Sequence, residues 1–317
     1  MTSLDPAVFR PESIDPETAA FNAQWEAMFA GQPPTYTQKP ADVRAARAAG
    51  KGPRGPIIRS PNAKERVIDG PAGHLSMRMF LPPRVEGVYL HIHGGGWVLG
   101  SSDAQDERLE RICNACNLVV LSVEYRLAPE DPYPAGPDDC EAAAVWLAKN
   151  AQSEYGTDRL LIGGESAGAH LAVVTALRLR DRHGLTPFSG AYLGYGLYDP
   201  ELTPSARRWG NRTLVLNTPV LDWFSDHFVP PALRRDPDVN PLFADLTGMP
   251  PALFVVGTLD PLLDDTLFMH ARWLAAANQA ELNVYPGGIH GLDGLATTMA
   301  KTAQARQEAF FTKALSG

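Results

Sequence analysis

Residues 160–177 read LLIGGESAGAHLAVVTAL and carry the clearest structural signal in this chain of 317 residues. The apolar run at 160–162 is typical of a buried strand, and the apolar stretch that begins at Leu171 favours a helix. Ser166 lies between them, at the centre of a Gly-x-Ser-x-Gly motif. Glycine on both sides permits a sharp strand-to-helix turn, because no Cβ blocks the approach of neighbouring segments. The pentapeptide alone is a weak signal, because it also occurs by chance in loops. The prediction of a nucleophilic serine therefore depends on the strand before it and the helix after it.

The rest of the chain alternates short apolar runs with helical patterns. Buried strands are expected at 88–92, 118–123, 160–162, 191–193 and 253–256, a half-exposed strand near 75–81 and a last strand at 281–285. Helices are expected at 18–29, 41–49, 106–116, 138–148, 167–180 and 266–277. Such alternation predicts an α/β fold with a mostly parallel, doubly wound sheet.

Residues 200–231 interrupt this alternation. The segment has no buried-strand pattern, but it contains Trp209, Trp223, Phe224 and Phe228. It is too aromatic for a solvated linker, so we predict an inserted helical cap. The expected organisation is an N-terminal cap segment at 1–55, a core at 56–198, an inserted cap segment at 199–235 and a second part of the core at 236–317.

Composition and charge restrict the class of partner. Hydrophobic residues make up 44% of the chain and charged residues 20%, which is ordinary for a folded globular protein. The net charge of -8 disfavours nucleic acids and anionic membranes, so a small-molecule partner is expected. Residues 1–20 lack the pattern of a signal peptide and no apolar run is long enough to cross a bilayer, which predicts a cytoplasmic protein.

Cysteine usage agrees with a reducing compartment. The 3 cysteines, Cys113, Cys116 and Cys140, are an odd number and do not suggest a disulfide framework. Cys113 and Cys116 form a C-x-x-C motif, but the sequence has no second pair to complete a metal site. We expect buried thiols.

A serine nucleophile needs an imidazole to accept its proton. His290 is the expected base, because it follows the last strand-like segment in a glycine-containing loop and the carboxyl ends of parallel strands form the ligand site. Asp260 follows the strand predicted at 253–256 and is the expected partner of the imidazole. Asp264, one helical turn later, remains an alternative. The order Ser166, Asp260, His290 is the order found in α/β-hydrolases.

Acyl transfer also needs hydrogen-bond donors for the oxyanion. Residues 93–97 read HGGGW after a predicted strand, and consecutive glycines let backbone N–H groups converge. The N–H of Ala167, at the expected helix start, is a further donor. His91 and His93 could suggest a metal site, but no third ligand accompanies them. We therefore expect neither a metal nor an organic cofactor.

Five ordered motifs together resemble the hormone-sensitive-lipase-like branch of the α/β-hydrolases, the bacterial family IV carboxylesterases. They are the HGGGW motif at 93–97, EYRLAPE at 124–130, GESAG at 164–168, DPL at 260–262 and HG at 290–291. The resemblance implies an eight-stranded sheet, a cap built from the N-terminal segment plus the insertion after the sixth strand, and hydrolysis of short-acyl esters. It also implies a possible homodimer.

The resemblance assigns roles to further residues. It makes Gly95, Gly96 and Ala167 the oxyanion donors, and it gives His93, Gly94 and Glu165 supporting roles. The chain departs from the family pattern at Glu165, where Asp or Thr is more frequent, at Ala169 and at Leu292. Trp97, Trp223 and Leu292 are the expected substrate-pocket residues.

The resulting hypothesis is a serine carboxylesterase that works through an acyl-enzyme intermediate. Amide, lactone or carbamate hydrolysis would use the same residues. A non-catalytic ligand receptor on the same fold is a further alternative, which the presence of His290 disfavours.

Overall fold

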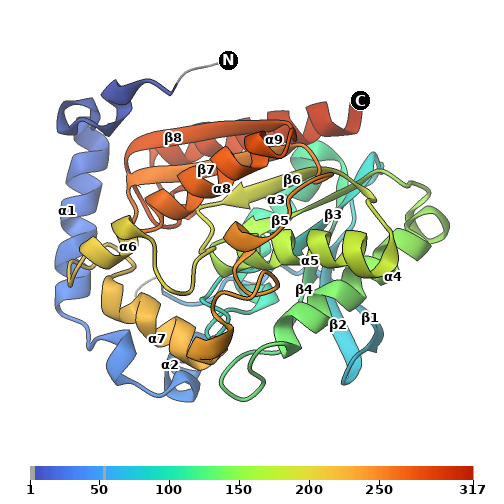
Figure 1. Cartoon of the computed structure of the whole chain (residues 1–317), viewed down its shortest axis with the longest axis horizontal. Coiled ribbons are helices and arrows are strands. Elements are labelled where there is room, and N and C mark those ends of the chain that lie inside the picture. The colour runs from blue at the N-terminus through green and yellow to red at the C-terminus, as the bar shows by residue number, and fades with distance from the viewer. Residues whose placement is uncertain (1–3, 53–54, 317) are drawn as a thin grey trace.

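The computed structural model describes residues 4–52 and 55–316 and contains one eight-stranded sheet (Figure 1). The strands are β1 (Lys64–Gly70), β2 (Gly73–Phe80), β3 (Gly87–Ile92), β4 (Leu118–Val123), β5 (Leu160–Glu165), β6 (Phe188–Gly194), β7 (Ala252–Leu259) and β8 (Ala280–Ile289). Their order is β1-β2-β4-β3-β5-β6-β7-β8. β2 pairs antiparallel with β1 and β4, and the six strands β3 to β8 all pair in parallel with one another along the sheet. The predicted mostly parallel, eight-stranded α/β sheet is confirmed.

Helices cover both faces of this sheet. The long helices are α1 (Pro16–Ala30), α2 (Pro40–Ala48), α3 (Asp106–Cys116), α4 (Ala135–Tyr155), α5 (Ala167–His183), α7 (Thr218–Phe228), α8 (Leu263–Ala275) and α9 (Thr298–Ser316), with a short α6 (Pro204–Arg208). Apolar residues of α3 and α9, among them Leu109 and Phe311, form the core on one face. Residues of α4, α5 and α8, among them Leu147 and Trp273, belong to the larger core on the other face.

The parallel strands bring the predicted site residues to one edge of the sheet. Ile92 at the end of β3 pairs with Gly164 near the end of β5, so the loops after these strands begin side by side. The end of β7 likewise pairs with the end of β8, where Leu259 lies opposite Ile289. The loops at this edge therefore carry the glycine triplet, Ser166, Asp260 and His290.

The segment between β6 and β7 contains helices in place of strands. In the described chain it holds α6 and α7 and a single isolated bridge between Leu214 and Leu216. Asn217 caps α7 by accepting a hydrogen bond from the N–H of Val220. Figure 1 shows α6 and α7 beside α1 and α2, and an ion pair between Glu26 and Arg212 joins the two parts. The N-terminal helices and the insertion thus lie together.

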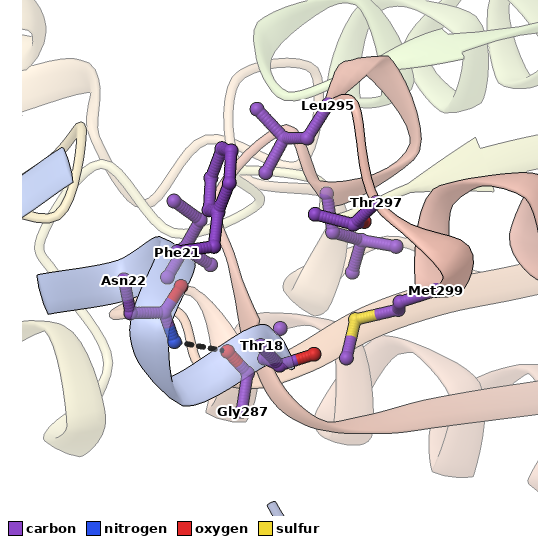
Figure 2. A pocket seen from close by; sticks show the side chains of 10 residues that line it. Thr18, Phe21, Asn22, Gly287, Leu295, Thr297 and Met299 are labelled. Atoms are coloured by element: carbon purple, nitrogen blue, oxygen red, sulfur yellow. Dashed lines mark hydrogen bonds between the residues drawn. The ribbon is translucent and has the colours of Figure 1, made fainter. Parts of the chain in front are cut away.

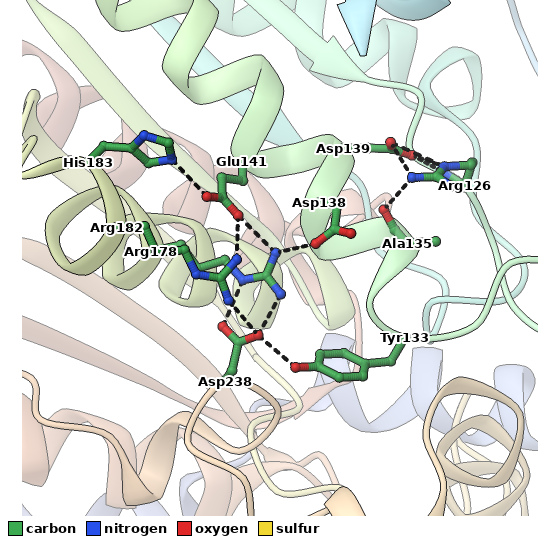
Figure 3. A network of polar contacts seen from close by, with 10 residues as sticks. All are labelled: Arg126, Tyr133, Ala135, Asp138, Asp139, Glu141, Arg178, Arg182, His183 and Asp238. Carbon is green, nitrogen blue, oxygen red and sulfur yellow. Dashed lines mark hydrogen bonds and ion pairs between the residues drawn. The ribbon is translucent and has the colours of Figure 1, made fainter. Parts of the chain in front are cut away.

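Both ends of the insertion are fixed to the core by buried polar groups. Where the chain leaves the core, Asp265 of α8 accepts hydrogen bonds from the N–H of Tyr198 and the hydroxyl of Thr203, at 2.8 and 2.5 Å. Where it returns, Arg178 of α5 binds Asp238 with Nη2 2.5 Å from Oδ2. Figure 3 shows Arg178 among carboxylates from both sides, including Asp138 of α4. The insertion is therefore held at two separate points.

The cysteines have the environment that the sequence suggests. All three are free and buried. Burial raises the pKa of the Cys113 and Cys116 thiols to about 11, so both are protonated and unreactive at neutral pH.

Candidate active site

Ser166 occupies a strained turn between β5 and α5. Its φ is +58° and its ψ is -124°, a region that L-residues seldom occupy, and its N–H donates to the carbonyl of Gly194 at 2.9 Å. A Cβ at Gly164 would lie 2.0 Å from the carbonyl oxygen of Ile92, and one at Gly168 would lie 1.9 Å from it. Both glycines are required because the turn presses against the end of β3.

Ser166, His290 and Asp260 form a continuous chain of hydrogen bonds. The Oγ of Ser166 lies 3.0 Å from Nε2 of His290, and Nδ1 of His290 lies 2.9 Å from Oδ2 of Asp260. A carboxylate can only accept, so Nδ1 carries the proton and Nε2 is free to accept the serine proton. The other Asp260 oxygen accepts from the N–H of Leu262 at 2.9 Å. The alternative acid, Asp264, instead accepts from the N–H of Ser205 at 2.8 Å.

The glycine triplet follows β3 and faces the serine turn. Gly95 and Gly96 have φ values of +118° and +61°, and a Cβ at Gly95 would lie 2.4 Å from the nitrogen of Gly100. The N–H of Gly94 is engaged by Glu165, at 3.1 Å from Oε1. Ala167 is the first residue of α5, where helical N–H groups lack intrahelical partners. A Cβ at Gly94 would lie 3.2 Å from Cβ of Ser166, so the glycine loop directly adjoins the serine turn.

His93 supports this loop from within the core. Its Nδ1 donates to the carbonyl of Gly94 at 2.9 Å, and its ring stacks on Tyr125 with centroids 4.2 Å apart. The Tyr125 hydroxyl donates to the carbonyl of His93 at 2.9 Å. Burial lowers the pKa of His93, which keeps the ring neutral. His93 is thus placed to brace the glycine loop without contacting the serine.

Comparison with known proteins agrees with this geometry. Residues 89–293 match a protein family described by its alpha/beta hydrolase fold. The chain belongs to the α/β-hydrolase family. This hydrolase is 36% identical to the carboxylic ester hydrolase LipN of Mycobacterium tuberculosis over 238 residues, which cover 71% of the chain and 62% of LipN. It is 34% identical to the carboxylesterase NlhH of the same organism over 73% of the chain and 75% of NlhH.

A solved structure extends the similarity to nearly the whole chain. A thermostable esterase from Pseudomonas putida superposes on this hydrolase with a TM-score of 0.84 and 26% identity, covering 95% of this chain and 98% of the other. These similarities confirm the hormone-sensitive-lipase-like branch that the motifs suggest.

A buried ion network lies behind the hydrolase triad. Besides the bond to Gly94, Glu165 contacts Nε2 of His91 at 3.0 Å and Nη1 of Arg108 at 3.6 Å. Arg108 also pairs with Asp293 at 2.6 Å, and Asp293 accepts from the hydroxyl of Tyr195, also at 2.6 Å. Burial opposes ionisation of the Glu165 carboxyl, but His91 and Arg108 outweigh this effect and lower its pKa. Burial likewise opposes ionisation of the Asp293 carboxyl, but Arg108 and the hydroxyls of Tyr192 and Tyr195 lower its pKa.

This network contacts three of the loops at this edge of the sheet. It contacts the glycine loop at Gly94 and the serine turn at Glu165. The ring of Tyr195 meets the His290 ring edge to face, with centroids 4.9 Å apart. The network also occupies His91, half of the H-x-H pair.

Within residues 4–52 and 55–316, no group of three or more His, Cys, Asp or Glu side chains is arranged to hold a metal ion. In the same ranges, no helix has both the length and the apolar character needed to cross a membrane.

The three expected pocket residues lie in different surroundings. Trp97 is 1% exposed and packs against His170 and Phe228, so its side chain lies in the core. Trp223 is half-buried on α7 and contacts Phe224.

Leu292 is also buried and lines a small cavity between α1 and the end of β8. Figure 2 shows this cavity with Phe21, Leu295 and Met299 around it and Asn22 donating to the carbonyl of Gly287 at 2.8 Å. The cavity adjoins the loop that carries His290, since Ile289 is also part of its lining.

Sequence reasoning did not find the contacts that the aromatic residues of α7 make. A Cβ at Gly96 would lie 2.3 Å from the ring of Phe224, so this ring lies directly on the glycine loop. Phe228, one helical turn later, stacks on Trp97. The i, i+4 spacing of the two phenylalanines was the available signal, but it does not reveal which loop the helix faces.

Proposed function

We propose that this protein is a serine carboxylesterase that hydrolyses short-acyl esters through an acyl-enzyme intermediate. The observation that supports it is the continuous bonding from Ser166 through His290 to Asp260, next to a glycine loop and a helix start. The names of the relatives, carboxylic ester hydrolase and carboxylesterase, support the same reaction class.

In this mechanism, Oγ of Ser166 attacks the ester carbonyl carbon while Nε2 of His290 accepts the hydroxyl proton. The tetrahedral oxyanion is stabilised by the N–H groups of Gly95, Gly96 and Ala167. When the C–O bond breaks, His290 returns its proton to the leaving alcohol. Water then attacks the acyl-enzyme with His290 again as the base, which releases the acid and restores Ser166. Asp260 holds the His290 tautomer and stabilises the imidazolium.

The preference for short acyl groups is supported by the position of Phe224. Its ring fills the space directly above Gly96, next to the proposed oxyanion donors. An acyl chain bound at the oxyanion must pass this ring, so little room remains for a long chain. Trp223, beside Phe224 on the same helix, is part of the proposed pocket wall. Amide, lactone and carbamate substrates share the chemistry and are separated by a substrate panel.

The reaction is tested with Ser166→Ala and p-nitrophenyl acetate. Loss of the nucleophile should lower kcat by roughly a millionfold, because the triad works as a unit. The control is Ser153→Ala, which removes an exposed hydroxyl on α4 and should leave kcat unchanged. A fluorophosphonate probe should label the parent protein and Ser153→Ala but not Ser166→Ala. Full activity of Ser166→Ala would refute the mechanism, and absence of labelling in the parent would favour the receptor alternative.

Chain-length preference is tested with p-nitrophenyl esters from two to sixteen carbons. The parent protein should prefer the shortest acyl groups, and Phe224→Ala should move the optimum of kcat/KM to longer ones. A parent preference for long chains, or an unchanged optimum in Phe224→Ala, would contradict the assignment of Phe224 as the limit of the acyl pocket.

A further inference from the structure

Trp97 has an unfavourable backbone conformation directly after the glycine triplet. Its φ is +61°, which is unfavourable for a non-glycine residue and persists only where surrounding contacts fix it. One contact is a hydrogen bond from the N–H of Ala128 to the carbonyl of Trp97 at 3.0 Å. The side chain makes the others.

The indole of Trp97 is held by a cap helix and by the helix of the nucleophile. Its Nε1–H donates to Nδ1 of His170 at 3.1 Å, and the His170 ring meets it edge to face at 5.1 Å. Phe228 of α7 stacks on it with centroids 4.3 Å apart and an interplanar angle of 10°. The indole is 1% exposed, so it can leave this position only if the cap or α5 moves.

His170 has a single protonation state that suits this role. Its Nε2 lies 2.7 Å from the carbonyl oxygen of Val239, which can only accept, so Nε2 carries the proton and Nδ1 is an acceptor. Burial lowers the pKa of His170 to about 4, so the ring is neutral at working pH. His170 also lies one turn after the nucleophile, with its N–H bonded to the carbonyl of Ser166 at 3.3 Å.

The glycine loop needs such an anchor because its glycines have no side chains whose contacts could hold the backbone in one conformation. Gly95 and Gly96 both have positive φ, and glycine has more conformational freedom than any other residue. Neither has a side chain that could lock its N–H direction. Trp97 is the first residue after them with a side chain, and that side chain is buried against two other elements.

We propose that Trp97, held by His170 and Phe228, is a positioning residue that fixes the N–H groups of Gly95 and Gly96 in the direction of the oxyanion. The inference rests on the proposed esterase function and adds a specific role for the cap. The cap helix α7 then contributes to transition-state stabilisation through a residue that does not touch the substrate.

The first test compares two identical substitutions of buried tryptophans. Trp97→Phe keeps an aromatic ring for Phe228 but removes the donor to His170. Trp273→Phe is the matched control. Trp273 lies on α8, is also fully buried and donates its Nε1–H to the carbonyl of Pro250 at 3.0 Å. Removing one oxyanion donor costs about 10²–10³ in kcat. Misdirected donors in Trp97→Phe should therefore lower kcat about 10- to 100-fold with little change in KM, whereas Trp273→Phe should retain the parent kcat.

A second pair isolates the hydrogen bond from the bulk of the residue. In His170→Asn, the amide oxygen can lie where Nδ1 lies and accept from Trp97, whereas His170→Leu has no acceptor. Both variants lose the donor to Val239, so the difference between them reports on the Trp97 bond alone. We expect kcat to fall in His170→Leu and to be largely restored in His170→Asn.

The readout that separates positioning from folding is a trifluoromethyl ketone inhibitor, whose serine adduct carries the oxyanion. Its affinity should fall in parallel with kcat/KM in Trp97→Phe and His170→Leu, while fluorophosphonate titration still counts a full complement of reactive Ser166. Equal kcat losses in Trp97→Phe and Trp273→Phe, or unchanged inhibitor affinity, would overturn the proposal and leave the esterase function intact. An unreactive Ser166 in the parent protein would instead refute the esterase function.

Discussion

Gly168→Ala tests how closely the nucleophile turn depends on the end of β3. The added Cβ would lie 1.9 Å from the carbonyl oxygen of Ile92, whereas ordinary contacts begin at 3.4 Å. The start of α5 must therefore move by about 1.5 Å, and Ser166 lies only two residues earlier. Since a misplacement of about 1 Å can cost about 10² in rate, kcat should fall at least about 100-fold.

The same substitution at the other end of α5 is the control. Gly184 follows the last residue of the helix with φ +65°, and a Cβ there would meet nothing within 4 Å. Gly184→Ala should cost about 1–2 kcal/mol of stability from the left-handed backbone. Gly168→Ala should lose about 1–3 kcal/mol from overpacking.

Urea unfolding and p-nitrophenyl acetate kinetics on both variants separate stability from geometry. Comparable stability losses with a kcat defect only in Gly168→Ala are expected. A Gly168→Ala enzyme within twofold of the parent kcat, or an equal kcat loss in Gly184→Ala, would refute the reasoning.

Three further predictions concern the acid of the triad, the Arg178 ion pairs and the titration of His170. Asp260→Asn should lower kcat by about 10⁴, because the His290 tautomer is lost, whereas Asp264→Asn should stay within a few-fold of the parent; steady-state kinetics that reverse this order would reassign the acid. Arg178→Met should lower the unfolding free energy by about 3 kcal/mol, because three carboxylates lose their shared partner. The kcat of the folded protein should stay unchanged. A urea midpoint equal to that of the parent would contradict this prediction. Because the folded-state pKa of His170 is about 4 and its ordinary value is 6.5, unfolding releases the ring to take up a proton. The unfolding free energy of the parent should therefore fall by about 3 kcal/mol through His170 as the pH falls from 6.5 to 4. The unfolding free energy of His170→Asn should fall less over that range. Parallel curves of stability against pH would contradict this prediction.

Local sequence patterns predicted the core elements well, because the hydrophobic pattern of each segment matches the helix or strand that it forms. The helix expected at 106–116 has those bounds in the structure, and the strand expected at 118–123 also matches. The helix expected at 138–148 extends over Ala135–Tyr155 in the structure. Its start was predicted too late because Gly136 and Pro137, in its first turn, resemble loop residues in the sequence.

Ser166, Asp260 and His290 could be expected to lie near one another because each follows a strand, and parallel strands end at the same edge of a sheet. The contacts of Trp97 and Glu165 could not be foreseen in the same way. The position of Trp97 depends on a positive φ that no local pattern encodes for a tryptophan, and on Phe228, which is 131 positions away along the chain. The partners of Glu165, among them Arg108 of α3, come from other elements that only the tertiary fold brings together.

The two anchors of the insertion have a consequence for protein engineering. Because Asp265 fixes its beginning at Thr203 and Arg178 fixes its end at Asp238, the segment between them can be exchanged as a cassette without altering a sheet strand. A library that varies this segment would explore new ester specificities on an unchanged core. Such a library should retain an aromatic residue at the position of Phe228, because that ring is the point at which the cassette meets Trp97.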